Sequence, residues 1–413
     1  MRVLHILSQR PSLTGSGITL DALVRCAADA GWDQRAVVGI PEIGPEPEVG
    51  GLDGDRVHSL RFGAGDLAFD VPGMSDVMPY PSTVFGAMDG ATVAAYLRGW
   101  RDHLSAVIDS FRPDVIHSHH VWLMSSILKD LAPSTPVVTH CHATGLRQME
   151  LVPRLGDRVR SGCARNDAFV VLHRLHADAL AAALRVPGDR VHVVGAGYRD
   201  DIFSARGRHA GSDPTVLYIG KYSAAKGLPW LLDAFDRVAA DRPGLTLHIA
   251  GDGSGAEADE LRERMRAMAP RVVLHGQVDQ VALAGLMRRS TVCVLPSFYE
   301  GLPLVLVEAL ACGCRLVATA LPGVVEEIAP KIGSALELVD LPPMAGIDTP
   351  DIAGLPAFVD RLARAVTRAV DAGPAGDRAA ELETFTWRAV FGRIEHVWRR
   401  VIADARDQQL MSP

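Results

Sequence analysis

Short apolar runs, each followed by a polar or glycine-containing loop and then by an amphipathic stretch, recur along most of this chain. The first example consists of the apolar run 3–7, the loop 8–17 and the amphipathic stretch 18–30. A strand, a loop and a helix in this order form the repeating unit of a parallel β-sheet covered by helices. The pattern therefore predicts an α/β protein with doubly wound parallel sheets.

The same alternation continues through both halves of the chain. In the first half it predicts further strands at 36–39, 114–117, 136–139, 168–172 and 191–194, and helices at 92–111 and 176–184. In the second half it predicts strands at 216–220, 245–250, 272–274, 292–295 and 316–318, and helices at 227–240, 257–268, 303–312 and 387–405.

Two segments interrupt the alternation. Residues 204–215 are small, polar and turn-forming, which is typical of an interdomain linker. We therefore expect a Rossmann-like domain over residues 1–203, a linker over 204–215 and a second Rossmann-like domain over 216–385. Residues 41–90 are rich in Pro, Gly and Asp but contain aromatic and Met residues, so we expect a long ordered excursion near a site. In two doubly wound halves, a ligand would lie in the cleft at the carboxyl ends of both sheets.

Composition excludes several classes of protein. Of the 413 residues, 48% are hydrophobic and 22% are charged, which is enough apolar material for a buried core. The longest apolar stretch, 302–321, is broken by Glu308 and Arg315, so we expect no membrane insertion. The formal net charge of -7 argues against nucleic acid as a partner. The N-terminus lacks the pattern of a signal peptide, and six irregularly spaced cysteines favour reduced thiols in the cytoplasm.

The segment 300–308, EGLPLVLVE, carries the strongest chemical signal. Glu300 falls in a loop after a predicted strand, and Glu308 follows about two helical turns later, so both carboxylates can face one pocket. Between them a helix begins, and its free N–H groups suit a phosphate, with Leu304 and Val305 as donors because Pro303 has no N–H. A buried charge among apolar neighbours is costly without a partner, which favours a functional Glu308 over a solvated one.

Two lysines mark a second candidate segment, the strand-to-helix loop 220–227. Lysine occurs at only four positions of the chain, and two of them, Lys221 and Lys226, lie in this loop. Point charges in such a loop suit a pyrophosphate, although two solvated lysines are the simpler alternative.

Histidines gather at the ends of two predicted strands, in His117-Ser118-His119-His120 and His140-Cys141-His142. Neighbouring strands would bring them together, and His119 could then bond a substrate hydroxyl or act as an acid or base. A zinc site is the alternative, although structural zinc sites usually combine Cys and His in tighter patterns.

Glycine turns supply further candidates. Gly15-Ser16-Gly17 after the first strand resembles a phosphate-binding turn but lacks the third glycine of the dinucleotide fingerprint. Gly251 and Gly253 would let a nucleotide approach the backbone, or would simply form a turn. We interpret Asp53-Gly54-Asp55, which precedes a weak strand, as a turn rather than a metal site, and Cys312-Gly313-Cys314 as small-residue packing rather than a redox pair.

Together these motifs resemble the GT-B-fold, family-4 retaining glycosyltransferases. The donor-binding half of that family is matched by the lysine loop, Gly251-Asp252-Gly253, His275-Gly276 and the run from Pro296 to Ala309. The acceptor half is matched by the N-terminal glycine loop and by the segment 114–119. The resemblance implies two Rossmann-like domains that face each other across a cleft, with a closing helix, residues 386–413, packed on the first domain.

The resemblance also assigns roles to residues. Lys221 and Lys226 would hold the donor pyrophosphate, although the family usually has Arg at the first position, so Lys221 keeps the charge but loses a bidentate fork. Glu300, followed by Gly301 and Leu302, would contact sugar hydroxyls, Glu308 the ribose, and the backbone near Gln277 and Val278 the base. His119 would lie beside the anomeric carbon. The acceptor or phosphate loop would comprise Gly15, Ser16, Gly17, His120, His140 and His142.

The implied activity is metal-independent, front-face transfer of a sugar from a UDP- or GDP-sugar, with retention, to a small soluble acceptor through oxygen or sulfur. No cofactor is implied beyond the nucleotide sugar as co-substrate, and the oligomeric state stays open, with a homodimer as one alternative. Other functions on the same fold are a sugar-nucleotide epimerase, a phosphorylase and a non-catalytic nucleotide-sugar-binding protein.

Overall fold

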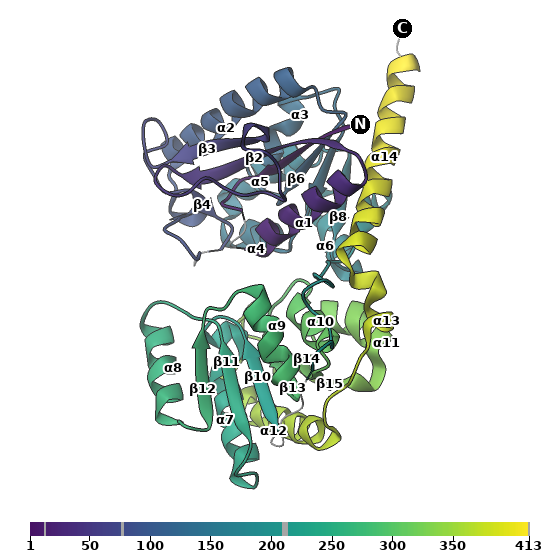
Figure 1. Cartoon of the computed structure of the whole chain (residues 1–413). Coiled ribbons are helices and arrows are strands. Elements are labelled where there is room, and N and C mark those ends of the chain that lie inside the picture. Colours follow the sequence, from purple (N-terminus) through teal and green to yellow (C-terminus); the bar gives the residue numbers. More distant parts are fainter. Residues whose placement is uncertain (12–13, 76–77, 209–213, 412–413) are drawn as a thin grey trace. The chain divides into compact units, whose positions relative to one another are not determined.

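The computed structural model describes residues 1–11, 14–75, 78–208 and 214–411. By their contacts, the residues divide into two compact units (Figure 1). The first unit combines Met1–Ala196 with Trp387–Pro413, and the second contains Gly197–Thr386. Each unit is built on its own parallel sheet, as the alternation of strands and helices predicted.

The first unit contains a seven-stranded sheet in the order β3-β2-β1-β6-β7-β8-β9. Every neighbouring pair of strands is parallel. The central strands are buried along almost their whole length, which explains their nearly continuous apolar sequences. The strands are β1 (Arg2–Leu7), β2 (Asp33–Pro41), β3 (Val57–Phe62), β6 (Val115–His119), β7 (Val137–His140), β8 (Ala168–Val171) and β9 (Val191–Val193).

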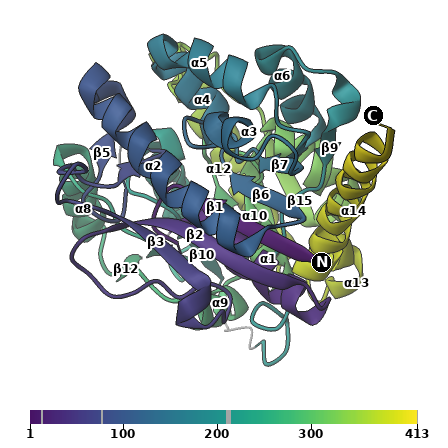
Figure 2. The same ribbon diagram turned by 90° about the horizontal axis from the view of Figure 1, so that it is seen from above.

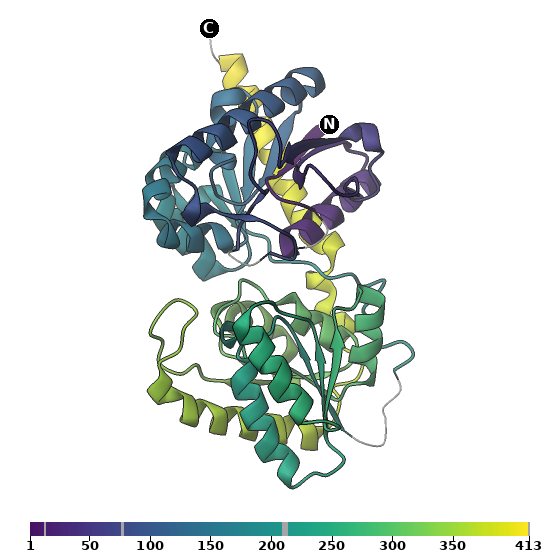
Figure 3. The same cartoon turned by 90° about the vertical axis from the view of Figure 1, so that its left-hand side faces the viewer.

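Helices cover both faces of this sheet (Figure 2). One face packs against the larger apolar core, which is shared by α2 (Gly90–Phe111), α3 (Leu128–Leu131), α4 (Thr144–Leu151), α5 (Pro153–Cys163) and α6 (Arg174–Leu184). On the other face lies α1 (Gly15–Asp29), which contacts α14 (Trp387–Met411). The closing helix is therefore part of the first unit, and Figure 3 shows it running along this unit's sheet.

The described residues of the excursion over 41–90 contribute to the sheet and to the core. The weak strand after Asp55 is β3, which pairs with β2 at the edge of the sheet. Two short strands, β4 (Pro72–Gly73) and β5 (Thr83–Val84), pair with each other. The side chains of Met74, Phe85 and Met88 are buried in the larger core, which ties the excursion to the unit. Residues 76 and 77 of the predicted excursion lie outside the described residues.

The second unit contains a six-stranded parallel sheet in the order β12-β11-β10-β13-β14-β15. Its strands are β10 (Thr215–Ile219), β11 (Thr246–Ala250), β12 (Val272–Gly276), β13 (Val292–Leu295), β14 (Arg315–Thr319) and β15 (Leu336–Val339). One core joins the sheet to α7 (Leu228–Ala240), α8 (Ala256–Ala267) and α12 (Leu355–Ala372). Also in this unit are α9 (Gln280–Arg289), α10 (Leu304–Ala311), α11 (Ala329–Ile332) and α13 (Ala379–Leu382). The alternation of apolar runs and amphipathic stretches did not predict β15 or α12.

The segment between the two sheets belongs by its contacts to the second unit. The Tyr198 backbone N–H donates to the Phe385 carbonyl at 2.9 Å. The Arg208 guanidinium donates to the carbonyls of Ser290 at 2.6 Å and of Cys312 at 2.8 Å. The contacts therefore place the division at residues 196 and 197, before the linker expected over 204–215. Residues 209–213 of that linker lie outside the described residues.

Within the described ranges, none of the helices combines the length and the apolar character needed to cross a lipid bilayer.

Candidate active site

The strand orders define one topological switch point in each sheet. In a doubly wound sheet, ligands bind at the carboxyl ends of the two strands where the order of connection reverses. This point lies between β1 and β6 in the first unit and between β10 and β13 in the second. The predicted histidines lie in the last residues of β6 and its neighbour β7 or directly after them, the lysine loop follows β10, and Glu300 follows β13. The topology thus brings the sequence-predicted residues to the two positions where such folds bind ligands.

The lysine loop of the second unit is held tightly by its neighbours. The Tyr218 hydroxyl donates to the Lys221 carbonyl at 2.7 Å, and the Phe298 N–H donates to the Ala225 carbonyl at 3.0 Å. Gly227 has a φ of +72°, and a Cβ atom there would lie 2.1 Å from the Pro296 carbonyl oxygen. Only glycine fits this position, because both the backbone angle and the space exclude a side chain. The loop after β10 is therefore packed directly against the loop after β13.

Lys226 and Glu300 meet across this contact. The Lys226 ammonium Nζ lies 2.7 Å from Glu300 Oε1, and both side chains are mostly buried. The sequence predicted both residues as ligand contacts, and the structure places them side by side. Lys221 lies on the same loop and is exposed. The pair thus combines a cation and a carboxylate at the switch point of the second sheet.

Glu308 lies in the middle of α10, which begins at Leu304, after Pro303. The residues next to it, Val307 and Ala309, are fully buried, while Glu308 itself keeps a small part of its surface exposed. Burial raises the pKa of the Glu308 carboxyl to about 7. A carboxyl group with this pKa changes charge near neutral pH and is typical of a functional site.

The glycine turn after β11 also approaches the lysine loop. Gly251 has a φ of +131°, and a Cβ atom there would lie 2.0 Å from the Gly220 carbonyl oxygen. Its N–H donates to the Gly276 carbonyl at 2.8 Å, which places the start of the segment with Gln277 and Val278 beside it. Asp252 accepts a hydrogen bond from Arg262 at 2.8 Å, which anchors the turn. The three loops that follow β10, β11 and β12 are therefore in contact at one edge of the sheet.

In the first unit, the glycine loop differs from the expectation. We expected residues 8–17 to form a loop, but α1 begins at Gly15, so Gly15, Ser16 and Gly17 form its first turn. The cause is the Thr14 side chain, which accepts a hydrogen bond from the Gly17 N–H at 3.2 Å and caps the helix. Residues 12 and 13 of the predicted loop lie outside the described residues.

Gln9 organises this turn and was missed by the sequence analysis. Its buried amide Nε2 donates to Thr14 Oγ1 and to Ser16 Oγ, each at 2.9 Å. Its Oε1 accepts the Met74 N–H at 3.3 Å, and Gln148 Nε2 donates to the Met74 carbonyl at 3.2 Å. The excursion is thus bonded to the helix start near the carboxyl end of β1. A single glutamine after a strand gives no distinctive sequence signal.

The structure brings the predicted histidines together, as neighbouring strands should. His119 and His140 are paired in register on β6 and β7. The Nδ1 atom of His119 lies 3.0 Å from Nε2 of His142, and the His140 and His142 rings stack with centroids 4.1 Å apart. His120 Nδ1 lies 3.1 Å from the Thr144 hydroxyl. The predicted cluster is therefore one layer of packed imidazoles.

These imidazoles are held in the neutral state. Burial lowers the pKa of His117, His119 and His142 well below the usual value, and lowers that of His120 and His140 to about 3. The neighbouring imidazoles lower the pKa of most of them further, because like charges repel. The backbone is strained beside them, since His120 and Ala143 have φ values of +71° and +70°. Strain of this kind is concentrated at functional sites.

Three of the rings have the spacing of a metal site. His117, His119 and His140 each place one ring nitrogen within 4.8 Å of the others. Among the described residues, no other group of three or more His, Cys, Asp or Glu side chains has this spacing. Asp53 instead precedes the short 3₁₀ turn Gly54–Arg56 and Asp55 lies within it, and both are exposed, in line with their interpretation as a turn. Cys312 and Cys314 are free thiols at the end of α10, separated by Gly313 with a φ of +88°.

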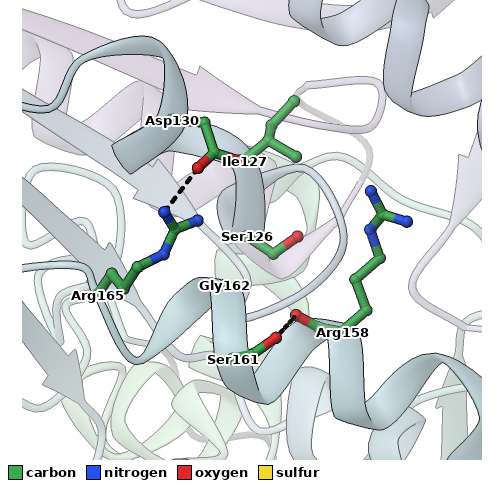
Figure 4. Close-up of a pocket in the computed structure, with 7 residues that line it drawn as sticks. All are labelled: Ser126, Ile127, Asp130, Arg158, Ser161, Gly162 and Arg165. Atoms are coloured by element: carbon green, nitrogen blue, oxygen red, sulfur yellow. Dashed lines mark hydrogen bonds and ion pairs between the residues drawn. The ribbon is translucent and has the colours of Figure 1, made fainter.

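A separate cavity of about 410 Å³ lies between α3 and α5 in the first unit (Figure 4). Asp130 and Arg165, which are 2.6 Å apart there, lie just before β7 and β8, at the amino ends of the strands. The hydroxyls of Ser126 and Ser161 both donate to main-chain carbonyls. None of the sequence-predicted site residues lines this cavity.

Comparisons with known proteins agree with this architecture. Residues 14–197 match the family described as glycosyl transferase 4-like domain, and residues 213–340 match glycosyl transferases group 1. A glycogen synthase of Mycobacterium tuberculosis is 30% identical over 234 residues, which cover 53% of this chain and 55% of the relative. The chain thus spans about half the length of this relative.

Two further proteins are similar over more of the chain. A D-inositol 3-phosphate glycosyltransferase of Acidothermus cellulolyticus is 29% identical over 71% of this chain and 68% of its own. The solved structure of sucrose-phosphate synthase from Thermosynechococcus elongatus superposes with a TM-score of 0.68 and 19% identity, covering 98% of this chain and 100% of the other. The matches to the two families span most of the chain, and the fold agrees with them, so the chain belongs to the GT-B-fold glycosyltransferases.

Proposed function

We propose that the protein transfers a glycosyl group from a UDP- or GDP-sugar to a small acceptor, with retention of anomeric configuration and without a metal ion. The observation that carries this proposal is the Lys226–Glu300 pair at 2.7 Å, at the switch point of the second sheet. A cation for the diphosphate and a carboxylate for sugar hydroxyls are the two groups that a nucleotide sugar requires. Membership of the glycosyltransferase family supports the same conclusion.

The second unit would bind the donor. Lys226 would exchange the Glu300 carboxylate for the donor pyrophosphate, which frees Glu300 to accept hydrogen bonds from sugar hydroxyls. Lys221 would add a second positive charge, and the N–H groups at the start of α10, near Leu304 and Val305, would complete the phosphate site. Glu308 would bind the ribose, Gly251 would allow close approach of the nucleotide, and the backbone at Gln277 and Val278 would contact the base.

The chemistry would then proceed through an oxocarbenium-like state. As the bond to the anomeric carbon breaks, negative charge grows on the leaving phosphate, and Lys226 and Lys221 stabilise it more than they stabilise the bound substrate. In a front-face route the departing phosphate accepts the proton of the incoming hydroxyl or thiol. His119 would bond a sugar hydroxyl through its neutral ring.

The first unit would bind the acceptor, at the start of α1 and beside His120, His140 and His142. The relative from Acidothermus is named for D-inositol 3-phosphate, which makes a small phosphorylated polyol the first acceptor to test. We propose the cytoplasm as the compartment, because all six cysteines are free thiols and five of them are buried.

Isothermal titration calorimetry with UDP and GDP tests the donor site. We expect one of them to bind, and we expect Lys226→Ala to weaken that binding by about tenfold or more, because a charge-assisted bond is lost. Lys129→Ala is the matched control, since Lys129 forms an ion pair with Asp167 at 3.0 Å in the first unit and should not affect binding. No heat with either nucleotide, or an equal effect of both variants, would refute the site.

Turnover tests the assigned chemistry. With a bound UDP- or GDP-sugar and D-inositol 3-phosphate as the first acceptor, we expect Glu300→Gln to lower kcat on the order of a hundredfold while nucleotide affinity changes little. Conversion of the nucleotide sugar without any acceptor would indicate an epimerase, and dependence on inorganic phosphate would indicate a phosphorylase. Binding without turnover across an acceptor panel would indicate a non-catalytic binding protein.

A further inference from the structure

The buried imidazoles of the first unit have ring nitrogens without partners. Among the described residues, Nε2 of His117, Nε2 of His119 and both nitrogens of His140 are buried and form no hydrogen bond. The three rings each place one nitrogen within 4.8 Å of the others. Which nitrogens carry protons therefore decides whether this cluster presents donors or lone pairs.

One contact fixes a proton. The indole Nε1 of Trp398, on α14, lies 2.9 Å from Nδ1 of His117, and both side chains are completely buried. An indole N–H can only donate, so Nδ1 of His117 must be the acceptor. A nitrogen that accepts this hydrogen bond carries no proton, so the ring is neutral and has its single proton on the other nitrogen. The His117 proton is therefore on Nε2, the nitrogen that has no partner.

His119 is the next ring of the cluster. The Nδ1 atom of His119 is bonded to Nε2 of His142 at 3.0 Å, so its other nitrogen, Nε2, is the one without a partner. Either ring can donate in this contact, because each neutral imidazole has one donor and one acceptor. Nε2 of His117 forms no hydrogen bond with His119, so the contact with Trp398 alone fixes the proton of His117.

We propose that Trp398 is a positioning residue that sets the tautomer of His117 in this cluster, so that this ring carries its proton on Nε2. A residue of the C-terminal helix thereby determines that the nitrogen of His117 without a partner is a donor. The sequence places Trp398 far from His117 in the chain, and the packing of α14 on the sheet brings them together.

The same contact has a consequence for metal ions. A metal ligand must offer a lone pair, and the second nitrogen of a metal-bound histidine usually donates its N–H to an acceptor. The contact with the Trp398 indole excludes this arrangement for binding through Nε2, because Nδ1 of His117 accepts the indole N–H and the His117 proton is on Nε2. The three-imidazole cluster then lacks one of the lone pairs that a metal would need, despite its suitable spacing.

NMR of the full chain with ¹⁵N-labelled histidine tests the tautomers, since protonated and unprotonated ring nitrogens have distinct shifts. We expect His117 to be protonated on Nε2. Trp398→Phe removes the indole N–H, and benzothienylalanine at position 398 removes it while keeping the size of the ring. With either change, no indole N–H holds Nδ1 of His117 as an acceptor, so a fraction of the His117 rings should carry the proton on Nδ1. Trp32→Phe is the control, because Trp32 packs on Trp398 with ring centroids 5.1 Å apart but donates to Glu395.

Titration with Zn²⁺ alone provides a second readout. We expect both substitutions at position 398 to bind Zn²⁺ at least about tenfold more tightly than the unchanged protein, because His117 can then offer Nε2 without opposing the indole N–H. Three results would overturn the proposal: His117 protonated on Nδ1 in the unchanged protein, tautomers that stay the same in both position-398 variants, or equal Zn²⁺ affinity in all proteins. None of these readouts depends on the identity of the acceptor.

Discussion

At the scale of single residues, the burial of Glu308 changes the pKa of its carboxyl group, and this change affects how the stability of the protein depends on pH. Its pKa is raised from 4.5 to about 7 by burial. Between these two pH values the folded protein binds more protons than the unfolded chain, so the free energy of unfolding falls as the pH rises through this window. Above pH 7 the carboxyl group is charged in both the folded and the unfolded state. The free energy of unfolding then stays lower, because the folded state keeps this charge buried.

We therefore predict that Glu308→Gln gains stability relative to the unchanged protein as the pH rises. The relative gain between pH 5 and pH 8 should be on the order of 2 kcal/mol, since one pKa unit corresponds to about 1.4 kcal/mol. Urea denaturation of both proteins at the two pH values measures it. Glu327→Gln, which alters a partly exposed carboxylate paired with Lys331 at 3.5 Å, is the comparison. A difference between Glu308→Gln and the unchanged protein that does not vary with pH would contradict the prediction.

At the scale of elements, the loops around the second switch point depend on close backbone contacts. Gly227 has both a positive φ and a carbonyl oxygen 2.1 Å from any added Cβ, whereas Gly276, with a φ of +65°, has no atom within 4 Å of an added Cβ. The two glycines thus separate the cost of an unfavourable backbone angle from the cost of a collision.

We predict that Gly227→Ala destabilises the protein by about 2 kcal/mol or more beyond the effect of Gly276→Ala, and that it alone weakens nucleotide binding, because the Lys226 loop must move away from the Pro296 carbonyl. Thermal unfolding and calorimetry with UDP and GDP measure the two effects. If both alanine variants had equal stability, the close packing of the two loops would be disproved.

At the scale of the whole molecule, the first unit is built from both ends of the chain. Its first strand is β1, and its last helix, α14, buries Val390, Ile394 and Trp398. Glu395 of the same helix accepts the Trp32 indole N–H at 3.0 Å. The second unit has its own core, which contains none of these residues.

We predict that a chain ending at Thr386 loses stability in the first unit while the second keeps its fold, because each large apolar side chain removed from a core costs about 1.5–3 kcal/mol of burial. Hydrogen exchange measured peptide by peptide should show faster exchange in β1 and β6 and unchanged exchange in β10 and β13. Faster exchange in the second sheet, or unchanged exchange in the first, would show that α14 does not belong to the first unit in solution.

The sequence by itself determined the class of fold and most of the chemistry-bearing residues. Strand periodicity is a local property, so apolar runs such as 3–7 and 292–295 reveal their strands without knowledge of their neighbours. Parallel strands share one carboxyl edge, so the order of the motifs predicted that the histidines would gather, and the structure confirms it. The glycosyltransferase family was also predictable from the motifs, as the comparisons confirm.

Only the tertiary structure decided the contacts between residues distant in the chain. The Lys226–Glu300 ion pair, the Gln9–Met74 bond and the Trp398–His117 bond each join segments whose separation in the sequence carries no local signal. Backbone periodicity is encoded by neighbours a few residues apart, whereas pKa values, tautomers and ion pairs are set by whichever side chains the packing of whole elements brings within a few ångströms.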